Sequence, residues 1–181
     1  MIRHAVHAVP SWRCMRVAVA LLLASGCVST HALPGHAALT PDALGAVRIG
    51  MSRGQVEAML GKSLDISYDA SGSAACGTAS IDQPPVRLRF VEGSLAVISL
   101  LDDSIGTDKG IRIGDPESKV IATYGALKRT PTPYFDENDP QHQLYFWSSS
   151  GRGLLFWIDA QGAVENIEGG TDQLRAMEGC A

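Results

Sequence analysis

The sequence contains little that identifies a chemical reaction. It has no Gly-x-Ser-x-Gly motif to present a nucleophilic serine, and of its five histidines only His142 falls in the region expected to fold. Residues 60–63 (LGKS) resemble the end of a phosphate-binding loop, but Val56 stands where that loop needs its first glycine. These absences favour a binding or structural protein over an enzyme, and we expect no cofactor.

Positive charge is scarce beyond Cys27. All 19 acidic residues follow that position, against 12 of the 15 basic ones, which leaves a net charge of −7. This balance disfavours nucleic acids and anionic membrane surfaces as partners. Long hydrophobic runs are also missing, since the main apolar run, residues 17–24 (VAVALLLA), is far shorter than the roughly 20 residues that span a membrane.

That apolar run follows Arg3, Arg13 and Arg16, and a basic segment before a short apolar one is typical of a secretory signal. We therefore expect residues 1–26 to be a signal peptide. The stretch that ends at Cys27 (LLASGC) resembles a bacterial lipobox, which implies lipidation of Cys27 and, with Val28 next, sorting to the outer membrane. Ordinary cleavage after Ala32 is the alternative. Residues 27–39 would form a tether.

Cysteine is rare, and its distribution fits an exported protein. Cys14 lies in the signal, and Cys27 is either lipidated or removed with it. Both cleavage alternatives therefore leave Cys76 and Cys180 as a pair. An even remainder in an oxidising compartment predicts one disulfide, and two buried free thiols are the alternative. Neither cysteine has a second cysteine or a histidine at ligand spacing, so we predict no metal site.

Two stretches of the chain are nearly alike. Residues 47–61 (VRIGMSRGQVEAMLG) and 111–125 (IRIGDPESKVIATYG) share six identities at a constant offset of 64 positions, which indicates an internal repeat. Each stretch predicts a short helix that ends at a glycine, Gly61 or Gly125.

The two predicted helices begin differently. Ser52 with Gln55 forms a capping box, whereas Asp115 before Pro116 predicts a side-chain cap followed by proline at the first helical position. Thr40 and Pro41 predict a further short helix upstream of the first copy.

Predicted strands follow each helix. They cover 86–91 and 94–100 in the first copy, and 143–148, 153–158 and 163–168 in the second. We therefore predict an α+β fold of two tandem repeats, each a short helix or helix pair followed by an antiparallel β-meander, packed side by side. The repeats would span 40–101 and 111–170, with a linker at 102–110 and a C-terminal tail at 171–181.

The phrase IGMSRGQVEAMLG (49–61) resembles the helix motif of the BamE (SmpA/OmlA) outer-membrane lipoproteins. Two tandem copies of such a unit resemble the β-lactamase inhibitor protein fold. The second copy departs from the motif, with Asp115 and Pro116 in place of Met51 and Ser52. The matching residues are structural, so the resemblance implies a fold and a tendency to bind proteins, and it transfers no binding residue.

Aromatic residues are concentrated in the second copy. Because strand neighbours face opposite sides, Tyr145 and Trp147 oppose Leu144 and Phe146, and Trp157 opposes its neighbour Phe156. One face must be the helix-covered core, and the other either packs against the first copy or the tail, or forms an exposed binding patch. The candidate patch consists of Tyr134, Phe135, Tyr145, Trp147 and Trp157.

The acidic stretch 134–142 (YFDENDPQH) lacks the spacing of a calcium loop, and we expect it, with His142, to be a solvated loop. Together the patterns predict a lipid-anchored protein of the bacterial periplasm and outer membrane. It would bind another envelope protein, an inhibitor target or a ligand, and contact the membrane only through its N-terminal anchor. A hydrolase that uses carboxylates and His142, and a purely structural envelope component, are the alternatives.

Overall fold

The computed structural model describes residues 37–68, 75–132, 140–176 and 180, and one antiparallel sheet dominates it. Within these residues eight strands lie side by side in the order β3-β4-β5-β6-β10-β9-β8-β7. The strands are β3 (Ser67–Tyr68), β4 (Cys76–Asp82), β5 (Pro85–Val91), β6 (Ser94–Leu100), β7 (Lys128–Pro131), β8 (His142–Trp147), β9 (Gly153–Ile158) and β10 (Val164–Gly170). The fold is therefore α+β and mostly β.

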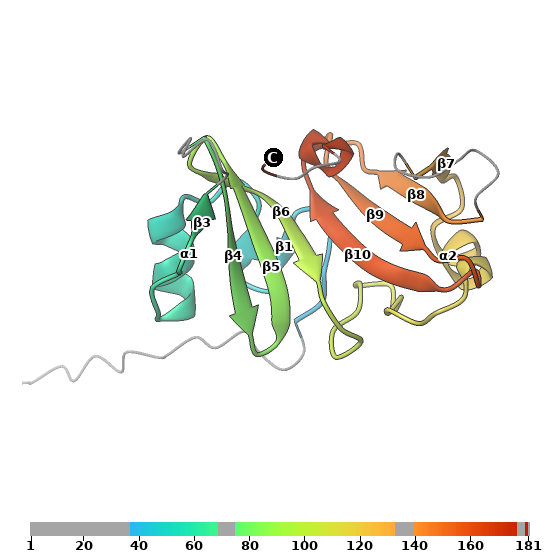
Figure 1. Cartoon of the computed structure of the whole chain (residues 1–181), viewed down its shortest axis with the longest axis horizontal. Coiled ribbons are helices and arrows are strands. Elements are labelled where there is room, and N and C mark those ends of the chain that lie inside the picture. Colours follow the sequence, from blue (N-terminus) through green and yellow to red (C-terminus); the bar gives the residue numbers. More distant parts are fainter. Residues whose placement is uncertain (1–36, 69–74, 133–139, 177–179, 181) are drawn as a thin grey trace, which may run out of the picture.

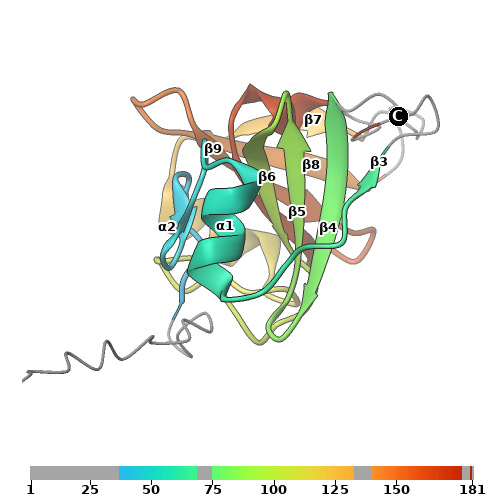
Figure 2. The same cartoon turned by 90° about the vertical axis from the view of Figure 1, so that its left-hand side faces the viewer.

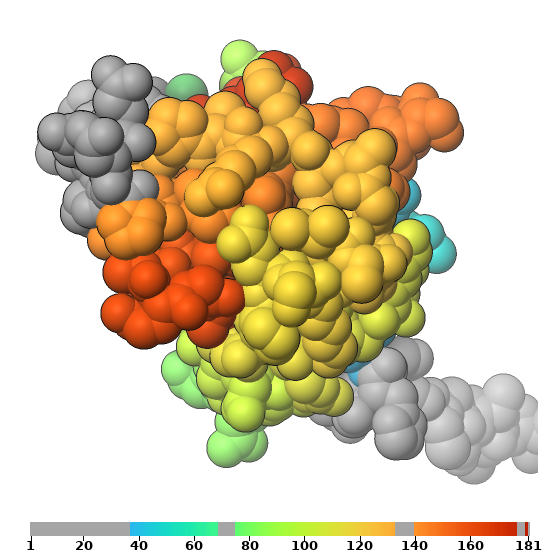
Figure 3. Space-filling view, turned by 90° about the vertical axis from the view of Figure 1, so that its right-hand side faces the viewer, coloured from blue at the N-terminus to red at the C-terminus, as the bar shows by residue number. Residues whose placement is uncertain are grey.

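Each half of the sheet follows one helix in the chain. The helix α1 (Arg53–Leu60) precedes β3 to β6, and α2 (Glu117–Tyr124) precedes β7 to β10. The two four-stranded meanders meet at the centre of the sheet, where β6 pairs with β10 and Ile98 lies opposite Gly169 (Figure 1). At one end of the molecule the yellow and gold segment that holds α2 and β7 covers much of the surface (Figure 3).

The starts of the two helices differ from each other. At α1 the predicted capping box is confirmed, since Ser52 Oγ accepts from the Gln55 N–H and Gln55 Oε1 accepts from the Ser52 N–H. At α2 the prediction of an Asp115 cap is wrong, because Asp115 Oδ2 instead accepts from the Arg112 N–H and from Lys119 Nζ, both at 2.7 Å. Pro116 is the capping residue, without a side-chain bond, and the helix begins one residue later than predicted.

The helix predicted at Thr40 and Pro41 is also wrong. Thr40 Oγ1 does accept hydrogen bonds from the Asp42 and Ala43 N–H groups, as a cap would. Gly45 then takes a φ of +58°, which turns the chain back on itself. The result is a small hairpin of β1 (Ala43–Leu44) and β2 (Val47–Arg48).

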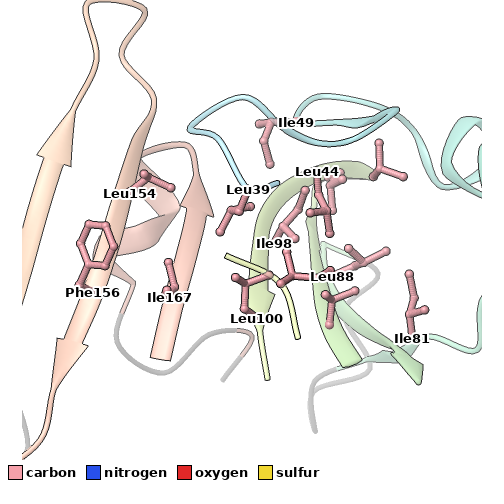
Figure 4. Close-up of a cluster of buried hydrophobic side chains, with 14 of the residues drawn as sticks. Leu39, Leu44, Ile49, Ile81, Leu88, Ile98, Leu100, Leu154, Phe156 and Ile167 are labelled. Atoms are coloured by element: carbon pink, nitrogen blue, oxygen red, sulfur yellow. The ribbon is translucent and has the colours of Figure 1, made fainter. Parts of the chain in front are cut away.

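A single hydrophobic core lies between the sheet and the two helices. Val56 from α1 and Val120 and Tyr124 from α2 belong to this core, and Figure 2 shows α1 beside the green strands of the sheet. The apolar residues run without a break from Phe156 on β9 to Ile81 on β4 (Figure 4). Both halves of the chain therefore close one shared core.

Candidate binding face of the sheet

Alternation along β8 and β9 divides the aromatic residues between the two faces of the sheet. Leu144, Phe146 and Phe156 belong to the helix-covered core, as predicted. Tyr145, Trp147 and Trp157 lie on the opposite face, here called the outer face, in a second and smaller apolar cluster. The members of that cluster are Val91, Ala96, Val97, Tyr145, Trp147, Leu155, Trp157 and Leu174.

Pairing across the strands arranges the outer face in rows. Thr130 on β7 lies opposite Gln143 on β8, which lies opposite Trp157 on β9, which lies opposite Asn166 on β10. The next row runs Lys128, Tyr145, Leu155, Glu168, Ser99 and Arg87. Residues that are distant in sequence thus form one continuous surface.

The C-terminal segment covers the centre of the outer face. The 3₁₀ turn η1 (Asp172–Arg175) buries Leu174 against the outer-face cluster. The Arg89 guanidinium donates to the carbonyls of Gln173 at 3.0 Å and Ala176 at 3.4 Å. The predicted disulfide between Cys76 and Cys180 is present and holds the tail to β4. Tyr145 and Leu155 are buried, while Trp147 and Trp157 remain half-buried.

One groove lies beside Trp147. It is lined by Lys128, Thr130, Pro131, Gln143, Tyr145, Trp147 and Arg175 and has a volume of about 200 Å³. Tyr145 stacks on Trp147 with 6.2 Å between ring centroids, and the Arg175 guanidinium lies 4.8 Å from the Trp147 ring centroid. Gly153 lies opposite Trp147 and leaves room for it, since a Cβ on Gly153 would come within 2.8 Å of the indole. We call this the Trp147 groove.

A second groove lies beside Trp157. It is lined by Thr132, Gln141, Trp157, Ile158, Glu165, Asn166 and Glu168 and has a volume of about 450 Å³. It adjoins the first groove at the Gln143–Trp157 pair, and it carries two carboxylates where the first groove carries two cations. We call this the Trp157 groove.

Glu168 is the most deeply buried of these carboxylates. Burial raises the pKa of Glu168, and the nearby Arg89 guanidinium opposes that shift. Glu168 Oε1 accepts a hydrogen bond from Ser99 at 3.1 Å, and Arg89 Nη2 lies 4.0 Å from Oε2. The position of Glu168 depends on a bulge between Val164 and Asn166, which changes which residues of β10 face outward.

Each groove is lined by two side chains with a buried polar atom that has no hydrogen-bond partner. These atoms are Thr130 Oγ1 and Trp147 Nε1, from residues that line the Trp147 groove, and Trp157 Nε1 and Asn166 Oδ1, from residues that line the Trp157 groove. Buried polar atoms in folded proteins are nearly always paired, so each unpaired atom calls for an explanation.

The prediction that His142 lies in a solvated loop is wrong. It is the first residue of β8 and only 4% exposed. His142 Nε2 lies 2.8 Å from Glu117 Oε1 on α2, and Nδ1 lies 2.8 Å from the Pro140 carbonyl and 3.1 Å from Arg129 Nη2. His142 lines neither groove, and its contacts connect β8 to α2 and β7.

Other predicted features lie outside the described residues. They are Tyr134 and Phe135 of the candidate patch, the acidic residues of the same loop, and Cys27. Among residues 37–68, 75–132, 140–176 and 180, no group of three His, Cys, Asp or Glu side chains is arranged to hold a metal ion. No helix in the same ranges is long and apolar enough to cross a membrane.

Sequence reasoning located the aromatic part of this face and missed its polar part. Gln143 could have been found, since it alternates with Tyr145 and Trp147 along one strand. Lys128 and Thr130 lie on an edge strand with a polar sequence, and Arg175 lies on a short turn of the tail. None of these three gives a signal in the sequence.

Comparisons of this chain with protein-family models, with curated proteins and with solved structures find no match.

Proposed function

We propose that this chain is an exported bacterial envelope protein, anchored by a lipid at Cys27, that binds a protein or a ligand through its outer face. The observation that carries the proposal is the pair of grooves, each lined by a tryptophan whose buried indole N–H lacks a partner. Unpaired indole N–H donors of this kind are expected on a surface that binds a ligand or a partner protein. Half-buried aromatic residues beside grooves are also the side chains that most often dominate binding energy at protein interfaces.

The location in the envelope is supported by the signal pattern and by the disulfide. Structural disulfides persist in oxidising compartments and are rare in the cytosol of most organisms. The Cys76–Cys180 bond therefore agrees with export of the chain. Lipidation at Cys27, with cleavage after Ala32 as the alternative, can be tested with a Cys27→Ala variant, which should leave the membrane fraction and become soluble in the periplasm.

The two halves are, in this proposal, copies of one unit that resembles the BamE-type helix and meander. Equivalent hydrogen bonds support it: the Gly50 N–H donates to the Leu95 carbonyl, and the Gly114 N–H donates to the Val164 carbonyl. The same two strand residues also donate in return: the Leu95 N–H donates to the Met51 carbonyl, and the Val164 N–H donates to the Asp115 carbonyl. Gly50 and Gly114 also share positive φ angles, +93° and +88°. The resemblance to the β-lactamase inhibitor protein fold favours a binding role.

A hydrolase that uses His142 is the less favoured candidate. Both ring nitrogens of His142 lie within hydrogen-bond distance of protein groups, and the ring is buried. A general base must reach the proton that it removes from a substrate. The contacts of His142 therefore support a structural role for this residue.

Photo-crosslinking in intact cells tests the binding proposal. A photoreactive residue at Lys128 or at Glu165 would lie on the exposed rim of one groove, and the same probe at Ile121, 46% exposed on α2, provides the control. The proposal predicts a discrete crosslinked species from Lys128 or Glu165 and none from Ile121. Equal labelling at all three positions, or none while the protein is folded and abundant, would contradict it.

A further inference from the structure

The two grooves differ in charge, and this difference limits the kinds of ligand that the Trp147 groove can bind. Every charged residue that lines the Trp147 groove is a cation, Lys128 from β7 and Arg175 from η1, and no acidic residue lines it within the described part of the chain. This is unusual in a chain whose residues after Cys27 carry a net charge of −7. Local positive charge attracts anions where the rest of the molecule repels them.

The polar atoms of the groove are mostly donors. The indole N–H of Trp147 can only donate, and the Thr130 hydroxyl can donate; both are buried without partners. The Oε1 atom of Gln143 accepts from the Tyr145 hydroxyl at 2.8 Å, and the amide N–H groups of Gln143 are further donors among the residues that line the groove. Unpaired donors on residues that line the groove, together with two cations, fit a ligand that brings acceptor atoms and negative charge.

The size and walls of the groove limit the ligand further. Drug-sized ligands occupy pockets of roughly 300–1,000 Å³, and the Trp147 groove measures about 200 Å³. Pro131 and the stacked rings of Tyr145 and Trp147 provide an apolar wall. A small apolar group that bears an anion fits both properties. A carboxylate has two oxygens, which match the two unpartnered donors, and it forms strong bonds with a guanidinium.

From these observations we infer that the Trp147 groove binds a carboxylate attached to a small apolar group, either a free organic acid or the C-terminal residue of a peptide. This inference rests on the proposed role of the outer face in binding. It adds a ligand class and assigns roles to the side chains. Thr130 and Trp147 would donate to the carboxylate, and Lys128 and Arg175 would hold its charge.

Nuclear magnetic resonance of the indole N–H groups tests the inference. In the ¹⁵N-labelled full chain the signals of Trp147 and Trp157 are assigned with W147F and W157F variants, so that one indole serves as the control for the other. The probes are phenylacetate and N-acetyl-Ala-Phe with a free C-terminus, each paired with its neutral amide. The inference predicts that both carboxylates shift the Trp147 signal in a saturable manner, while the amides do not and the Trp157 signal stays in place.

Variants identify the side chains responsible. Thr130→Val and Arg175→Gln should each weaken carboxylate binding about ten-fold, the order expected when a hydrogen bond to a charged group is lost. Lys62→Gln and Arg48→Gln remove exposed cations from residues outside the groove and should leave binding unchanged. The relative affinity of the two carboxylates then distinguishes a free acid from a peptide terminus.

Three results would overturn the inference. They are an unmoved Trp147 signal with both carboxylates, an equal shift with the amides, and unchanged affinity in both Thr130→Val and Arg175→Gln. Any of these, together with crosslinking from Lys128 or Glu165, would leave the outer face as a binding surface and remove only its specificity for carboxylates. Failure of crosslinking would instead count against the proposed function.

Discussion

The two faces of the same sheet are closed in different ways. The helix-covered face is filled by apolar side chains from both halves of the chain and from two helices. The outer face is covered by one short turn, η1, and the tail is held by Arg89 and by the Cys76–Cys180 disulfide. The helices and the apolar side chains fill the first face, whereas the Trp147 and Trp157 grooves remain on the outer face beyond the part that η1 covers. The helix-covered face therefore holds most of the apolar core, and the proposed binding role belongs to the outer face.

Removal of the disulfide that holds the tail on the outer face should have the largest effect on the stability of the protein. A Cys76→Ala/Cys180→Ala variant loses a crosslink over a separation of 104 residues. Chain-entropy arguments give a loss of about 4–5 kcal/mol in the free energy of unfolding for a loop of this size. Urea denaturation would measure it, with the reduced native protein as a control. A loss below about 1 kcal/mol would show that the tail is held without the crosslink.

Phe156 and Trp157 are sequence neighbours on opposite faces of the sheet. Replacing each by alanine compares how much the two faces contribute to stability. Phe156→Ala should cost about 3–5 kcal/mol, since its side chain is fully buried in the shared core. Trp157→Ala should cost less, because that side chain is half-buried beside a groove. Thermal and urea unfolding of the two variants would check the order. Equal losses would mean that the outer face is as important for folding as the core.

Substitution of Leu174 measures how much the packing of the tail on the outer face contributes to stability. It is 3% exposed and contacts the cluster around Tyr145 and Leu155. Leu174→Ala should cost about 2–5 kcal/mol, the range for a buried leucine. Exposed Leu101, which is 40% exposed, offers the matched control. The prediction fails if Leu174→Ala is no more destabilising than Leu101→Ala.

The smallest effect concerns pH and Glu168. Its pKa is raised on folding by burial, so the folded state binds the proton more tightly than the unfolded state. The contribution of Glu168 to stability is therefore fully present below the ordinary pKa of 4.5 and is lost as pH rises through the raised value. The Glu168→Gln variant has no carboxyl group at this position, so its stability carries no contribution from this proton.

The difference in unfolding free energy between the native protein and Glu168→Gln should consequently change with pH above 4.5, in favour of the variant. Urea titrations from acidic to neutral pH measure it, and Glu165→Gln provides a control at an exposed carboxylate of the same strand. A difference that stays constant, or changes in favour of the native protein, would contradict the shift.

The sequence predicted the parts of the fold that local patterns specify. The bounds of β6 and β9 were predicted correctly from their apolar runs, and the capping box located the start of α1. The pairing of Cys76 with Cys180 followed from the cysteine count together with the expected export of the chain. The division of Phe156 and Trp157 between faces followed from strand alternation.

Features that depend on tertiary neighbours were missed. The strand β4 has the sequence CGTASID, whose small and polar residues give weak alternation, and it forms because β5 pairs with it along its length. The edge strand β7 pairs with β8 alone. The Asp115 cap was lost because Lys119 and Arg112 compete for its carboxylate, and His142 is buried because Glu117 approaches it from another element.

The measurement that tests the central claim most directly is the yield of crosslinks from a probe at Glu165 in W147F and W157F backgrounds. Phenylalanine keeps an apolar ring and removes the unpartnered indole N–H. If the outer face binds through these donors, both variants will keep the melting temperature of the native protein and lose most of the crosslinked species. Unchanged crosslinking in both variants would contradict the assignment of the outer face as the binding surface.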